Sequence, residues 1–130
     1  MTDETAVRHT LDEYYRAFST LNVQAILPYL NEPASLVGPL GVIPLPTPQA
    51  IEPIFGPVME RLRTRGYARS ELSSPEIRML GAQSAFVTGN AIRYGSDGEE
   101  LESAGISYLL RKTDDAWKIA VLVLHEAPRS

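Results

Sequence analysis

Apolar residues recur at spacings of three and four through the first part of the chain, which is typical of one buried helix face. These positions are Val7, Leu11, Tyr14, Phe18 and Leu21. The spacing predicts a helix from Thr5 to Leu21, with Thr2 or Asp3 as its N-cap. Asn22 can cap a second, shorter helix, which Pro28 should kink or end because proline has no amide hydrogen.

The next segment, residues 34–46, reads ASLVGPLGVIPLP and contains three prolines. Proline cannot donate to a strand ladder, so this segment cannot be an interior strand over its full length. We predict only a short strand from Ser35 to Val37.

Thr47 followed by Pro48 is a typical helix start. Pro53, Gly56 and Pro57 disfavour one long helix beyond it. The sequence therefore predicts one short helix to about Phe55 and another from Pro57 to Arg65, ended by the glycine at position 66.

Beyond that glycine the pattern changes to strands separated by turn residues. The predicted strands are Tyr67 to Ser73, Glu76 to Leu80, Ser84 to Tyr94, Leu101 to Arg111 and Trp117 to Glu126. Pro75 could instead mark a bulge that joins the first two, and turns are expected at Asp97–Gly98 and Thr113–Ala116. Helices followed by a β-meander predict one α+β domain over residues 1–130, in which a curved antiparallel sheet wraps around the N-terminal helices and encloses a pocket.

The run from Ile119 to Leu124 is apolar at every position. Both faces of such a strand need cover. One face should meet the helices, and we expect the other to meet a second subunit in a sheet-to-sheet homodimer.

Composition narrows the functional classes. The net charge of −4 argues against nucleic-acid binding, and the absence of cysteine excludes disulfides and Cys-ligated zinc. No signal peptide or membrane-spanning run is visible, so the expected location is the cytoplasm, away from the membrane. The two histidines, His9 and His125, lack metal-site spacing, and no phosphate loop or dinucleotide fingerprint occurs, so cofactor-independent function is expected.

Three pieces of sequence carry a resemblance to a known family. They are the first helix with Tyr14, Tyr15 and Phe18, the segment NVQAILPYLNEPASL, and the C-terminal LLRKTDDAWKIAVLVLHE. In these pieces and in the order of its elements the chain resembles the nuclear transport factor 2-like superfamily, and within it the SnoaL-like domains. The resemblance implies a cone-shaped, cystatin-like fold with a ligand pocket at its wide end, often in a dimer. It also implies either a cyclase, isomerase, dehydratase or epoxide hydrolase activity, or a noncatalytic association or transport module.

The ketosteroid isomerase pattern matches this chain only in part. Its helix-one tyrosine falls on Tyr14, but its catalytic aspartate falls on about Gly38 and its oxyanion-hole aspartate near Gly105 or Ser107. That chemistry needs a base and two donors, and glycine supplies neither. Ketosteroid isomerase activity is therefore disfavoured.

Tyr14 and His125 are the candidate catalytic residues. Tyr14 projects from the helical stripe toward the expected interior, where it could donate a hydrogen bond to a ligand or satisfy a backbone partner. Strand alternation puts His125 on the face of Trp117, Ile119, Val121 and Val123, where it could be a general base or a structural strand-end residue. Glu126 must point to the opposite face, so it cannot pair with His125. Glu102 or Glu76 as a carboxylate partner of His125 is disfavoured, because glutamates near turns are usually solvated.

One strand has two possible orientations. Either Asn90, Ile92 and Tyr94 line the pocket, or Arg93 does and requires an acidic partner or an anionic ligand. The other expected wall residues are Phe18, Val37, Phe55, Met59 and Tyr108, with residues 38–46 at the mouth. We interpret Arg61, Arg63, Arg65 and Arg69 as a solvated face and His9 as exposed.

These observations favour a domain that binds a small, largely apolar molecule, with a cyclase, isomerase or dehydratase activity as one form of that function. The alternative is a noncatalytic dimerisation or ligand-sensing module of the same fold.

Overall fold

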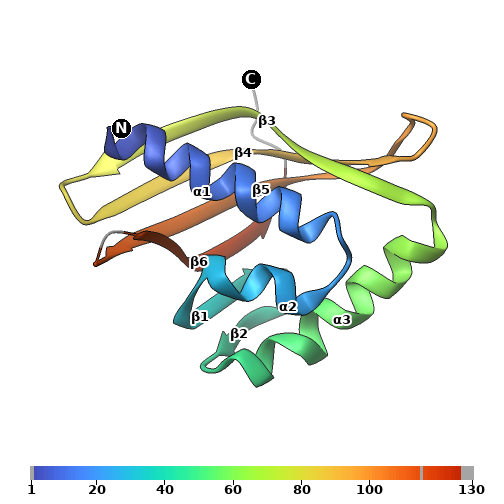
Figure 1. Ribbon diagram of the computed structural model, residues 1–130, viewed down its shortest axis with the longest axis horizontal. Coiled ribbons are helices and arrows are strands. Elements are labelled where there is room, and N and C mark those ends of the chain that lie inside the picture. Colours follow the sequence, from blue (N-terminus) through green and yellow to red (C-terminus); the bar gives the residue numbers. More distant parts are fainter. Residues whose placement is uncertain (1, 115, 127–130) are drawn as a thin grey trace.

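The computed structural model describes residues 2–114 and 116–126, and it is an α+β fold in which helices lie on one face of a six-stranded sheet (Figure 1). The helices are α1 (Asp3–Phe18), α2 (Val23–Ile26), a 3₁₀ turn (Leu27–Tyr29) and α3 (Pro48–Thr64). The strands are β1 (Leu30–Gly38), β2 (Gly41–Leu45), β3 (Tyr67–Leu80), β4 (Ser84–Gly95), β5 (Glu100–Thr113) and β6 (Ala116–His125).

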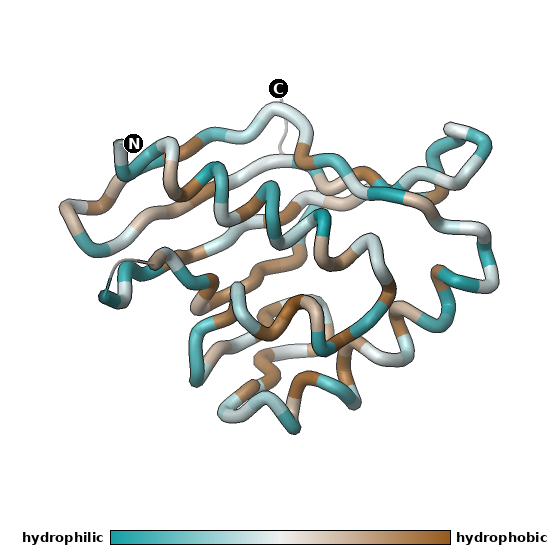
Figure 2. The backbone as a smooth tube through the Cα atoms, viewed as in Figure 1, coloured by the Kyte–Doolittle hydropathy of each residue, from teal (hydrophilic) through white to brown (hydrophobic). Residues whose placement is uncertain are grey.

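Helix α1 forms as its apolar spacing predicts. The side chain of Thr2 caps it by accepting a hydrogen bond from the amide of Thr5 at 3.1 Å. Figure 2 shows polar and apolar positions alternating along this helix. The predicted residues Val7, Leu11, Tyr14 and Phe18 are its buried face. Asn22 caps α2 as predicted, by accepting from the amide of Gln24.

Helix α3 corrects the prediction of two short helices, because it runs unbroken from Pro48 to Thr64. Pro53 and Pro57 are one helical turn apart on the exposed side, where water can satisfy the carbonyls that lose their amide partners. The opposite side buries Ile51, Phe55, Met59 and Leu62, and this apolar contact outweighs the helix-breaking residues. Gly66, at φ +74°, ends the helix region as predicted.

Two strands occupy the region where the sequence predicted one. β1 extends well beyond the expected Ser35–Val37, and β2 was not predicted. β2 contains Pro44 and is the edge strand of the sheet, where a missing amide donor removes no ladder bond.

The sheet has the order β2-β1-β6-β5-β4-β3 and is curved without closing (Figure 1). Every neighbouring pair is antiparallel except β1 with β6, which is parallel. β3 is one long strand whose register shifts between Ser73 and Glu76. Of the two alternatives that the sequence offered, the structure therefore shows the bulge at Pro75 and not two separate strands. The turn at Asp97–Gly98 is present, whereas that at Thr113–Ala116 lies partly outside the described residues.

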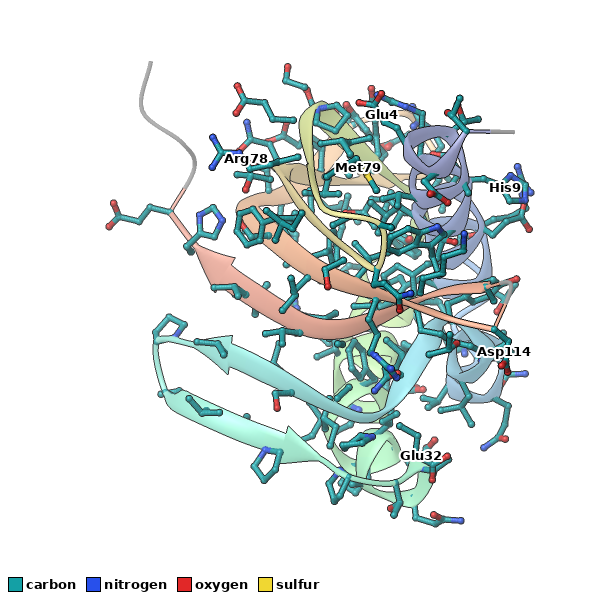
Figure 3. All side chains as sticks on the ribbon, turned by 90° about the vertical axis from the view of Figure 1, so that its left-hand side faces the viewer. Glu4, His9, Glu32, Arg78, Met79 and Asp114 are labelled. Carbon is teal, nitrogen blue, oxygen red and sulfur yellow. The ribbon has the colours of Figure 1, made fainter. Side chains whose placement is uncertain are left out.

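The two faces of the sheet differ in their surroundings. Figure 3 shows the neighbouring residues Met79 and Arg78 on opposite sides of β3, the first toward α1 and the second away from it. The face toward the helices, here called the inner face, carries Val87, Ile106, Tyr108, Leu110 and Leu122 into the core. None of the helices within the described ranges combines the length and hydrophobicity needed to span a bilayer.

An irregularity in β6 reverses the expected direction of His125. Leu110 pairs with Ile119, but Leu109 pairs with Val121, so position 120 is skipped in the ladder. Beyond this bulge, Leu122 and Leu124 take the inner face, and Val123 and His125 take the outer one. The prediction that His125 shares a face with Trp117 and Ile119 is therefore wrong.

Replacement of Leu62 by alanine should destabilise the fold strongly. Leu62 is 0% exposed on the buried face of α3, so the truncation leaves a cavity and should lower the free energy of unfolding by about 2–5 kcal/mol. Urea denaturation measures this value. Leu40→Ala is the matched control, because Leu40 is 97% exposed and its truncation should cost about 0.5 kcal/mol or less. Equal effects of the two substitutions would contradict the assigned packing.

Candidate functional site

A cavity of about 500 Å³ lies between the inner face of the sheet and helices α1 and α3. Its walls come from α1, α3 and all strands except β2, with Pro39 from the turn that follows β1. Most of the lining is apolar, including Phe18, Leu36, Ile54, Phe55, Val58, Ala91, Ile106, Leu122 and Leu124. The polar residues that border it are Tyr14, Tyr15, Arg61, Ser70, Arg93, Glu102, Ser103, Tyr108, His125 and Glu126.

Tyr14 projects from the buried face of α1 into this region. Its side chain is 4% exposed, and its hydroxyl makes no hydrogen bond to any of the described residues. Its ring lies 6.4 Å from that of Phe18 and 6.2 Å from that of Tyr108, centroid to centroid. Aromatic contacts therefore hold the ring in place, while its hydroxyl takes part in no hydrogen bond within the described part of the chain.

Tyr15 and Tyr108 form a second polar feature of the wall. Their hydroxyl oxygens are 2.8 Å apart in a hydrogen bond between α1 and β5. Burial raises the pKa of Tyr15 to about 12, and burial is also the main cause that raises the pKa of Tyr14 and of Tyr108. The tyrosines are therefore neutral hydroxyls at physiological pH and act as hydrogen-bonding groups.

Arg93 faces inward from β4, which is the second of the two orientations that the sequence left open. Its guanidinium lies over the Phe18 ring, 5.1 Å from the centroid, and its Nη1 donates to Glu102 Oε2 at 3.2 Å. The acidic partner expected for an inward Arg93 is thus Glu102, opposite it on β5.

Glu102 accepts from two further arginines. Arg61 Nη1 and Arg65 Nη1 approach its Oε1 at 2.8 and 3.0 Å. The hydrogen bond from Arg61 is the largest cause that lowers the pKa of Glu102, and the positive charges of the three arginines add to it against the opposing effect of burial. Glu102 is therefore an ionised anchor for the cluster and a weak proton acceptor.

His125 takes part in a chain of hydrogen bonds on the outer face of the sheet. Its Nδ1 lies 2.5 Å from the Glu126 carbonyl, and its Nε2 lies 2.9 Å from Ser107 Oγ, which is itself 2.9 Å from Thr88 Oγ1. A carbonyl only accepts, so Nδ1 carries the proton, and Nε2 of the neutral ring accepts from Ser107. Both nitrogens are occupied, and His125 borders the cavity only at its rim.

Comparison with known proteins agrees with this architecture. Residues 3–127 match the family described as NTF2-like protein (DUF6841). The chain belongs to this NTF2-like family. Comparison with curated protein sequences gives no match.

Solved structures share the fold of this NTF2-like protein at low sequence identity. An NTF2-like protein with a cystatin-like fold from Novosphingobium aromaticivorans aligns with a TM-score of 0.78 at 14% identity, covering 98% of this chain and 84% of that one. A putative calcium/calmodulin-dependent protein kinase II association domain from Xanthomonas campestris gives 0.73 at 17%, covering 95% and 87%. A ketosteroid isomerase-like protein from Erwinia carotovora atroseptica gives 0.68 at 17%, covering 98% of each. These likenesses show the fold.

The wall residues predicted for this NTF2-like protein divide into two groups. Phe18, Phe55 and Tyr108 line the cavity. Five others do not: Asn90, Ile92 and Tyr94 follow the outward alternation of β4, Val37 pairs with the outward Val123, and Met59 is packed in the core.

Sequence reasoning missed the charged part of the site. Arg61, which we had grouped with a solvated face, lines the cavity, and Glu102, which we expected in solvent, binds three arginines. The available signal was the alternation of β4 and β5, which places residues 93 and 102 on one face once a hairpin at Asp97–Gly98 is assumed. His9 is exposed as expected and points away from the sheet (Figure 3).

The positions that match the isomerase aspartates cannot present a carboxylate to this cavity. Gly38 has no side chain, and Ser107 points to the outer face. A Cβ on Gly105 would lie 2.6 Å from His125 Nδ1 and 2.2 Å from the Glu126 carbonyl oxygen, so it too would point outward. Among the described residues there is also no group of three or more His, Asp or Glu side chains able to hold a metal.

A second hollow, of about 430 Å³, lies between α1 and β3. Its lining includes Arg8, Asp12, Arg16, Arg69 and Glu71. Tyr15 and Ser70 border both hollows and form part of the wall between them.

The stability contributed by the Glu102 cluster should depend on pH. Because the folded-state pKa of Glu102 lies below 4.5, its ion pairs stabilise the fold fully above about pH 4.5, and this stabilisation is lost as pH falls through the lowered value. Wild type should therefore be more stable than Glu102→Gln at about pH 6, with the difference shrinking toward about pH 3. Urea unfolding across this range measures the difference. Glu76→Gln, at an exposed position, should show no such trend, and a constant difference for Glu102→Gln would contradict the prediction.

Proposed function

We propose that this protein binds a small, largely apolar molecule in the cavity between its helices and its sheet. The observation that carries the proposal is an apolar cavity bordered by the hydroxyl of Tyr14, which takes part in none of the hydrogen bonds among the described residues. Small-molecule sites commonly combine apolar walls with a few such hydrogen-bonding groups. A ligand oxygen that accepts from Tyr14 gains one hydrogen bond.

The size and lining of the cavity support this proposal. Small-molecule sites commonly measure roughly 300–1,000 Å³ and combine apolar walls with a few polar groups that orient the ligand. The cavity of about 500 Å³, with aromatic and aliphatic walls and the hydroxyl of Tyr14 at its border, fits that description.

Binding is favoured over proton-transfer catalysis. A cofactor-independent isomerase, cyclase or dehydratase needs a base within reach of the ligand. Glu102 is held ionised by three arginines, and both nitrogens of His125 are hydrogen-bonded. The role of His125 is therefore proposed to be structural, and that of Tyr14 to be ligand binding.

The Tyr14→Phe variant tests this proposal. A thermal-shift screen with lipids, polyketides and terpenoids, together with the neutral ketone 2-acetylnaphthalene, should identify compounds that raise the melting temperature of wild type. Removing the hydroxyl should weaken the affinity for a carbonyl-bearing ligand about fivefold to tenfold, because one buried hydrogen bond is lost. Tyr29→Phe, outside the cavity, is the matched control. Unchanged affinity in Tyr14→Phe would favour a purely structural tyrosine.

We further propose that two copies associate through the outer face of the sheet. Cross-strand partners place a continuous apolar stripe over this face, formed by Val42, Val37, Val123, Val121, Leu109 and Phe86. Val42 and Phe86 are 68% and 38% exposed in the single chain. The stripe crosses five neighbouring strands and forms one extended apolar surface. A twofold interface would bring this same surface of both copies together.

Light scattering over a concentration series measures this association. Wild type should be dimeric, and Phe86→Glu should shift it toward the monomer because a charge would be buried in the interface. Leu40→Glu, an equally charged change at an exposed turn outside the stripe, should leave the dimer intact. A wild-type protein that stays monomeric at every concentration would remove the proposal.

A further inference from the structure

The charges at one side of the cavity do not balance. Three guanidinium groups, from Arg61, Arg65 and Arg93, surround the single carboxylate of Glu102 at 2.8, 3.0 and 3.2 Å. One negative charge therefore faces three positive ones, although the whole chain carries a net charge of −4. Such a local excess of positive charge attracts an anion.

Arg93 places part of this positive charge beside the apolar wall of the cavity. Its side chain is 24% exposed, and it lies over Phe18, which also contacts Tyr14. Guanidinium has five N–H donors, and among the described residues the only hydrogen bond from Arg93 goes to Glu102. Donors therefore remain for a planar, bidentate acceptor.

Arg61 contributes a second positive charge, from the helix α3 side of the cavity. It extends from α3 with a side chain that is 49% exposed and lines the same cavity. Arg61 and Arg93 thus approach Glu102 from a helix and a strand, and both are shared between Glu102 and the cavity. The described lining holds one more carboxylate, Glu126, which follows β6. An anion is attracted to the arginines and repelled by both carboxylates.

We propose that the ligand of this cavity is an apolar carboxylic acid, whose carboxylate is bound by Arg93 and Arg61 and whose hydrocarbon body occupies the aromatic and aliphatic walls. The inference rests on the proposed ligand-binding function and names its ligand class. Tyr14 borders the same cavity, and its hydroxyl would donate to a carboxylate oxygen or to a second oxygen of the ligand.

Matched acid and amide pairs test this inference. Naphthalene-2-carboxylate and naphthalene-2-carboxamide have nearly the same shape and differ in charge, and decanoate and decanamide form an aliphatic pair. Isothermal titration at low ionic strength should show that wild type binds the acid of at least one pair about tenfold more tightly than its amide. Added salt should reduce the preference.

Arginine variants identify the groups responsible. Arg93→Gln should abolish the preference for the acid while changing amide affinity less than about twofold. Arg78→Gln, which removes the same charge from the outward side of β3 (Figure 3), should retain it. Arg61→Gln alters a half-exposed residue, so it should fold normally and reduce the preference in part, which keeps the test decisive if Arg93→Gln is unstable.

The outcomes separate the two proposals. Equal affinity for acid and amide, or a preference that survives both Arg93→Gln and Arg61→Gln, would overturn the carboxylate inference and leave the apolar binding site in place. A failure of all four compounds and of the wider screen to bind would contradict the proposed function itself.

Discussion

Contact between the aromatic face of α1 and the inner face of the curved sheet is the interaction on which the site depends. Phe18 lies edge-on to Tyr67 of β3, with ring centroids 6.0 Å apart at 88°, and edge-on to Phe55 of α3 at 6.5 Å and 76°. Tyr14 meets Tyr108 of β5 in the same manner. Edge-to-face contacts of rigid rings hold helix and sheet together. Because the sheet curves without closing, the layers enclose a hollow beside this contact.

The same aromatic contact explains how a charged group sits at an apolar site. An isolated guanidinium buried there would be costly, but Arg93 gains attraction from the Phe18 ring and from the Glu102 carboxylate. Glu102 in turn is held by Arg61 and Arg65 from the far end of α3. The ion cluster therefore ties the C-terminal end of α3 to β4 and β5 and gives the cavity a strongly polar wall.

The sequence predicted the elements whose signals are local. The 3.6-residue spacing of α1, the cap at Asn22 and the glycine after α3 are each decided by neighbouring residues, and the structure confirms them. The continuity of α3 was not predictable from its prolines, because burial of its apolar side decides it. The bulge at position 120 was also invisible, since a run of apolar residues carries no alternation to reveal a skipped residue. That one irregularity reversed the interpretation of His125, and the charged cluster was missed because its members are up to 41 residues apart.

The chemistry of this cavity follows from which groups can give protons and which can take them. The tyrosine hydroxyls and the arginines are donors, and burial keeps the tyrosines protonated. The carboxylate that pairs with the arginines, Glu102, has a lowered pKa, so taking a proton would forfeit its attraction to three cations. A site with strong donors and such a weak acceptor would stabilise negative charge on a bound molecule without removing a proton from it. The proposed recognition of an existing anion therefore requires less of these residues than the generation of a new anion would.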